Sequence, residues 1–212
     1  MTYDSCLTSI KDKGLIIMRN ESPAICNIVR GSMTPDYLQP EFDAGINFTK
    51  NLAEGSKILI LASWLSLMTL EIFNRSTKVK EIVLLDHDKS VIKLGKKIST
   101  LYPSMSITYI RKNVVFDDIS EYIDDKDGII IPSINMLLPF NELIPSPKKG
   151  ITISLTGTSN MLMKYGNTIY NVDDLKSQII AEKILFTKQY DTSFKYYEGE
   201  YKFKTSVLVA QV

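Results

Sequence analysis

The stretch KILILASWLSLMTLEIFNRSTKVKEIVLLDHDKSVI, residues 57–92, decides the fold of this chain. It contains two short apolar runs, 57–62 and 81–86, joined by a segment whose apolar residues recur at helical spacing over 67–73. Each run is apolar at successive positions, which is typical of a parallel strand that helices cover on both faces. The stretch therefore predicts two parallel strands joined by a crossover helix.

The same alternation of strands and helices continues along the chain. After the second strand, the pattern predicts a helix over 90–101, a strand over 106–110, an amphipathic segment at 119–123, strands over 128–131 and 150–155, a turn-rich loop at 156–160 and a helix over 172–184. Asp173 and Asp174 open this last helix, where the helix dipole favours acidic side chains.

The chain ends in two extended runs, 185–194 and 201–209, with no helical pattern between them. The connecting residues 197–200 include Gly199, which can supply the positive φ of a tight hairpin. The predicted fold class is therefore α/β. We expect a Rossmann-like, mostly parallel seven-stranded sheet that is flanked by helices and ends in a C-terminal antiparallel hairpin.

Composition and charge narrow the class of protein further. The chain has 212 residues, which suits one compact domain, and no apolar stretch is long enough to cross a bilayer. The N-terminus does not resemble a secretory signal, so we expect a cytoplasmic protein. The formal net charge of +1 gives no pull toward nucleic acid or membranes. Cys6, Cys26 and the single histidine, His87, are too few for a zinc site, and we expect both thiols to be reduced.

In an open parallel sheet, ligands bind beyond the carboxyl ends of the strands. Asp86 ends the second strand, about 20 residues past the first turn, where a carboxylate can accept hydrogen bonds from ribose hydroxyls. The alternative is that Asp86 and Asp88 cap the helix that follows them. The segment VLLDHDKSVI, residues 83–92, resembles the second motif of class I S-adenosylmethionine-dependent methyltransferases, and also that of spermidine synthases.

This resemblance implies a site for S-adenosylmethionine that spans three strand ends. It assigns cofactor binding to the first turn (Ala62, Ser63 and Trp64), to Asp86 and His87 after the second strand, and to Asn113 and Val114 after the third. The turn departs from the family because residues 62–66, ASWLS, contain no glycine, and Ile60 replaces an acidic residue that the family often carries. Asn113 can alternatively end its strand in a turn.

Ser133 and Asn135 follow the fourth strand and are the candidate catalytic residues. Neither is a strong base, so they would act by aligning the acceptor with the methyl group, and ordinary loop residues are the alternative. The resemblance covers 57–212. Residues 1–56, with an expected strand at 14–18 and helix at 36–52, form an N-terminal segment that acts either as a lid over the cofactor or as structural padding.

Three functions remain open. The first is methyl transfer from S-adenosylmethionine to a small-molecule acceptor. The second is aminopropyl or aminocarboxypropyl transfer with the same cofactor class, because the run from Asp86 to Val91 also resembles spermidine and nicotianamine synthases. The third is a non-catalytic binding protein that keeps the methyltransferase fold, which the missing glycines and Trp64 favour. Homo-oligomerisation stays open.

Overall fold

A computed structural model describes residues 1–134, 137–158, 171–196 and 199–212. Within these ranges the strands form one seven-stranded sheet in the order β3-β2-β1-β4-β5-β7-β6. The strands are β1 (Ser56–Leu61), β2 (Val79–Asp86), β3 (Ser106–Arg111), β4 (Gly128–Ile131), β5 (Thr152–Thr158), β6 (Lys183–Tyr196) and β7 (Gly199–Gln211). Strands β1 to β5 run parallel, whereas β7 is antiparallel to both β5 and β6. The predicted fold is confirmed.

Both faces of the sheet are buried because the central strands carry apolar side chains on each face. In β1, Ile58 and Ile60 belong to one hydrophobic cluster, and Leu59 and Leu61 belong to the other. The first cluster is covered by the helices α1 (Tyr3–Met18), α2 (Pro23–Gly31), α3 (Pro35–Lys50), α4 (Leu67–Ser76) and α5 (Lys89–Thr100). The second is covered by α6 (Phe140–Leu143), α7 (Val172–Lys176) and the chain around the 3₁₀ turn η1 (Ser120–Tyr122).

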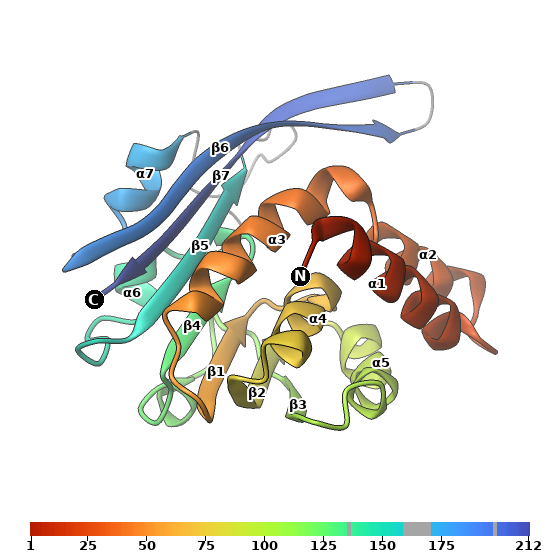
Figure 1. Cartoon of the computed structure of the whole chain (residues 1–212), viewed down its shortest axis with the longest axis horizontal. Coiled ribbons are helices and arrows are strands. Elements are labelled where there is room, and N and C mark those ends of the chain that lie inside the picture. The colour runs from red at the N-terminus through yellow and green to blue at the C-terminus, as the bar shows by residue number, and fades with distance from the viewer. Residues whose placement is uncertain (135–136, 159–170, 197–198) are drawn as a thin grey trace.

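Helix α3 fixes the geometry of the sheet's carboxyl edge. It packs on α4 and on β5, β6 and β7, and Figure 1 shows it lying across the half of the sheet that these strands form. Asp43 of α3 accepts hydrogen bonds from Tyr190 Oη (2.6 Å) and Lys188 Nζ (3.2 Å), both on β6. The ends of β6 and β7 continue past β5 as a two-stranded ribbon.

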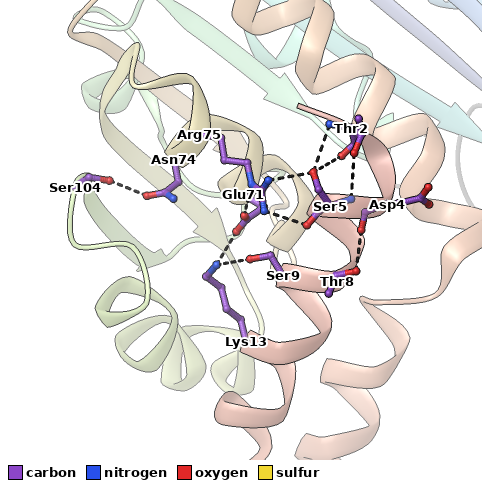
Figure 2. A network of polar contacts seen from close by, with 10 residues as sticks. All are labelled: Thr2, Asp4, Ser5, Thr8, Ser9, Lys13, Glu71, Asn74, Arg75 and Ser104. Atoms are coloured by element: carbon purple, nitrogen blue, oxygen red, sulfur yellow. Dashed lines mark hydrogen bonds and ion pairs between the residues drawn. The ribbon is translucent and has the colours of Figure 1, made fainter.

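A buried ion network joins α1 to α4 (Figure 2). The Glu71 carboxylate of α4 is 2% exposed and accepts from Lys13 Nζ at 2.7 Å and from Arg75 Nε at 2.6 Å. Arg75 also donates to the hydroxyl and carbonyl oxygens of Ser5. Burial alone would raise the pKa of Glu71, but the hydrogen bonds from Lys13 and Arg75 outweigh it and hold the pKa below its ordinary value. The network fixes α1 against the core.

Three predicted elements differ from the structure. The expected strand at 14–18 is wrong, since these residues form the last turns of α1, with Ile17 buried and Leu15 and Ile16 exposed. The helix expected over 172–184 ends at Lys176. The last two residues of the expected helix, Lys183 and Ile184, belong instead to β6 and pair with β7. The loop expected at 156–160 is part of β5 up to Thr158, which pairs with Thr205. The rest of that loop and residues 197–198 lie outside the described residues.

The N-terminal helices share the core of the sheet. Cys6 and Ile10 of α1, Val29 of α2 and Phe48 of α3 belong to the same cluster as Ile58 of β1. Across the described residues, no helix has the length and hydropathy needed to cross a membrane.

Candidate functional site

The turn after β1 has an unusual backbone. Ala62, Trp64 and Ser66 have φ values of +49°, +47° and +46°, so every second residue is left-handed. Left-handed φ favours glycine, and it costs other residues roughly 1–2 kcal/mol each. The chain therefore follows a path that suits a glycine-rich loop, although no glycine is present.

Asp86 holds this turn in place. Its Oδ2 accepts the backbone N–H of Trp64 at 2.8 Å, and its Oδ1 accepts that of Asp88 at 2.9 Å. Asp86 is 5% exposed. The capping alternative is confirmed for Asp88, which accepts from Ser90 N at 2.6 Å as the N-cap of α5. Asp86 itself anchors the turn after β1, and each of its oxygens retains a further lone pair.

A cavity of about 440 Å³ lies beside this turn and under α3, over the face of β4 and β5, and it reaches the residues that follow β1 and β4. Its walls are mostly apolar or hydroxyl-bearing. The lining residues are Gly31, Ser32, Leu38, Pro40, Glu41, Ala44, Gly45, Ser63, Trp64, Ser66, Leu67, Thr69, Ile130, Pro132, Ser133, Ser154, Thr156, Thr158 and Thr205. Ligand sites in α/β proteins commonly occupy this position relative to the sheet, and their volumes run from about 300 to 1,000 Å³.

Glu41 is the ionisable side chain in the described lining of this cavity. Its Oε1 accepts from Thr69 N at 3.0 Å and from Thr69 Oγ1 at 2.7 Å. Burial raises the pKa of Glu41 above its ordinary value, and the two hydrogen bonds from Thr69 oppose that rise. The cavity therefore contains one half-buried carboxylate, held at the first turn of α4.

The structure brings some of the predicted site residues together and separates others. Ser63, Trp64 and Ser133 line the cavity, and Trp64 is 42% exposed. Ala62 precedes them in the turn, outside the lining. Asn135 lies outside the described residues.

The residues predicted after β2 and β3 lie away from the cavity lining. The His87 side chain is 74% exposed, with its Nδ1 3.7 Å from Asp86 Oδ1. Asn113 Oδ1 accepts the backbone N–H of Val115 at 3.1 Å, which matches its alternative role in a turn, and Val114 is 7% exposed within the second cluster. Their roles in cofactor binding stay predictions.

Sequence reasoning missed Glu41, and the signal was present in the helical spacing. Leu38, Glu41, Gly45 and Phe48 recur at intervals of three or four, so they share one face of α3. Leu38 and Phe48 are almost fully buried. A carboxylate on the apolar face of a helix is uncommon and calls for a partner or a function.

The sequence matches no protein-family model and no curated protein. The structure is similar to solved methyltransferases and related transferases. The precorrin-6y C5,15-methyltransferase of Geobacter metallireducens matches with a TM-score of 0.52 and 10% identity, over 80% of this chain and 87% of that one. TYW2 of Pyrococcus horikoshii, in complex with MeSAdo, matches with a TM-score of 0.51 and 13% identity, over 84% and 64%.

A variant of the branched-chain polyamine synthase of Thermus thermophilus, in complex with an aminopropylspermidine and 5′-methylthioadenosine, matches with a TM-score of 0.57 and 10% identity. The match covers 84% of this chain but 56% of the synthase, so this chain spans little more than half of that protein. At these identities the similarity concerns the fold alone. The chain has the fold of the class I S-adenosylmethionine-dependent methyltransferases.

Proposed function

We propose that this chain is an S-adenosylmethionine-dependent methyltransferase that acts on a small-molecule acceptor. The observation that supports it most strongly is the turn after β1, which keeps a glycine-type backbone path beside a cavity that reaches the residues following β1 and β4. A strained backbone persists where surrounding contacts hold it, and such strain gathers at functional sites. Here Asp86 supplies one of those contacts.

The residues present fit this cofactor class. The cavity volume is within the range of ligand sites, and Trp64 offers an aromatic ring, which is a favourable neighbour for a cationic sulfonium. Asp86 lies on the other side of the Trp64 backbone, outside the described lining, and its remaining lone pairs would accept a ribose hydroxyl from a ligand that extends past the turn. When bound, S-adenosylmethionine supplies an activated methyl group on sulfur. The chain's own contribution is to align the acceptor and exclude water, and we assign the orientation of the acceptor to Ser133, which lines the cavity.

The test is calorimetric titration of the purified chain with S-adenosylhomocysteine, which needs no acceptor. Thr156 of β5 lines the cavity, so Thr156→Phe should fill it and abolish binding. Thr187→Phe makes the same change at an exposed position of β6 outside the cavity, and binding should persist. Absence of heat with the wild-type chain at millimolar ligand would favour the non-catalytic binding protein. Equal binding by both variants would place the ligand elsewhere.

A second candidate is aminopropyl or aminocarboxypropyl transfer. It is favoured by the cavity's charge, because Glu41 lies there and no cationic side chain is among the described lining residues, which suits a polyamine acceptor. Mass spectrometry of the products separates the two reactions. Methyl transfer leaves S-adenosylhomocysteine, whereas transfer of the alkyl chain leaves 5′-methylthioadenosine.

A further inference from the structure

The two oxygens of Glu41 differ in their surroundings. Oε1 receives both donors of Thr69, the backbone N–H and the hydroxyl. Oε2 receives no hydrogen bond and no ion pair from the described residues, although Glu41 borders the cavity. A carboxylate that is partly removed from water and only partly bonded is unfavourable in the empty protein. The raised pKa of Glu41, caused by burial, has the same origin.

Helix capping alone does not explain why this residue is a glutamate. Ser66, the N-cap of α4, makes no side-chain cap, and Glu41 serves the α4 terminus by accepting from Thr69 N. A glutamine at position 41 would accept the same bonds through its amide oxygen, without the cost of desolvating a charge. The helix dipole favours a negative charge at this end of α4, but only Oε1 contacts the helix, so Oε2 is surplus to the cap.

The rest of the described lining offers the Glu41 carboxyl group no cationic partner. The other described walls consist of hydroxyl-bearing and apolar residues, such as Ser63, Ser133, Thr156, Leu38 and Ile130. At Ile60, where related enzymes often carry an acidic residue, the side chain is fully buried in the first cluster. Glu41 approaches the cavity from a different element, α3.

We propose that Glu41 Oε2 binds the ammonium group of a ligand in this cavity. This inference rests on the proposed function and extends it by naming the charged group of the ligand that the cavity recognises. An aliphatic ammonium has three donors and can approach a single carboxylate oxygen directly. Two sources share this chemistry: the α-ammonium of the cofactor's amino-acid part, and an amine on the acceptor.

The experiment titrates three probes into the wild-type chain and Glu41→Gln. The probes are S-adenosylhomocysteine, 5′-methylthioadenosine, which lacks the amino-acid part, and spermidine as an aliphatic amine. If the cofactor supplies the ammonium, Glu41→Gln weakens the binding of S-adenosylhomocysteine by about ten- to a hundredfold and leaves the affinity for 5′-methylthioadenosine unchanged. If the acceptor supplies the ammonium, the substitution leaves the affinity for both adenosine probes unchanged and weakens the binding of spermidine by a similar factor.

Equal affinities of the variant and the wild type for all three probes would overturn the proposal. Equal losses of affinity for S-adenosylhomocysteine and 5′-methylthioadenosine would also overturn it, because the loss would then not depend on the ammonium group, which 5′-methylthioadenosine lacks. Glu54→Gln, at an exposed position outside the cavity, is the matched control and should bind like the wild type. A wild-type chain that binds spermidine alone would reject the methyltransferase proposal but keep the ammonium site. Binding of none of the probes would reject both.

Thermal unfolding provides a check that is independent of binding. A carboxyl whose pKa is raised by folding makes the folded state less stable above its ordinary value, near 4.5. Glu41→Gln removes that cost and keeps the acceptor for Thr69, so its Tm near neutral pH should equal or exceed that of the wild type. A clearly lower Tm would mean that the charge serves the fold, and would count against the proposal.

Discussion

At the residue scale, the turn after β1 stores strain that glycine would relieve. Ala62 has a φ of +49° and is half-buried, so its side chain contributes little packing. Ala62→Gly should raise the free energy of unfolding by up to about 1 kcal/mol, because relief of the left-handed strain exceeds the entropy that glycine adds to the unfolded chain. Chemical denaturation measures this difference.

The matched control is Ala24→Gly in α2, at an exposed helical position. Glycine there should lower the free energy of unfolding by at most about 0.5 kcal/mol, because the full cost of glycine in a helix applies to the interior and Ala24 is in the first turn of α2. Opposite signs at the two alanines support the strained turn. A loss at both would show that the turn is relaxed.

The same residues show what the sequence could predict of the site. The absence of glycine in the turn was visible, and together with Trp64 it favoured a non-catalytic binding protein. The backbone path was not visible, because φ at Ala62 and Ser66 depends on contacts such as Asp86 with Trp64 N, from another strand. The helical spacing places Glu41 on the apolar face of α3, but only the packing of α3 on α4 brings its carboxyl group to Thr69 and the cavity.

At the element scale, the attachment of α1 to α4 depends on Glu71. Its carboxylate is 2% exposed between Lys13 and Arg75, and removing one partner from a buried ion pair leaves the others uncompensated. Glu71→Gln should lower the free energy of unfolding by about 3 kcal/mol near neutral pH. Glu182→Gln breaks an exposed pair with Lys149 and should cost at most about 1 kcal/mol.

The pH dependence of this attachment follows from the lowered pKa of Glu71. A carboxyl whose pKa is lower in the folded chain stabilises it above the ordinary value of 4.5, and this contribution is lost as pH falls through the folded value. The stability gap between wild type and Glu71→Gln should therefore narrow below about pH 4.5. A gap that does not change with pH would contradict the assignment.

Elements were predictable where the local pattern and the tertiary contacts agree. Strands β1 and β2 are apolar at successive positions because helices cover both faces, so their sequence alone predicts them. The run at 14–18 has the same local pattern but belongs to α1, whose Leu15 and Ile16 are exposed. The short helix α7 was predicted too long, because the register of β6 against β7 is set by distant residues.

At the scale of the whole molecule, α1–α3 and the sheet share one hydrophobic cluster. We therefore expect the buried amides of α3, near Phe48, to exchange with solvent as slowly as those of β1 around Ile58. Native-state hydrogen exchange with mass spectrometry measures both segments in one sample. Fast exchange of α3 beside a protected β1 would instead identify the N-terminal segment as a lid that opens independently.

The fold as a whole was the most predictable level, since five strand patterns followed by a terminal hairpin leave few topologies. The central claim concerns what that fold holds, and a crystal structure grown with S-adenosylhomocysteine tests it most directly. We predict density for the ligand in the cavity between α3 and the turn after β1. Two results would contradict the proposed ligand site. The first is ligand density confined to the far side of Asp86, near His87 and Asn113, and the second is a cavity left empty at saturating ligand.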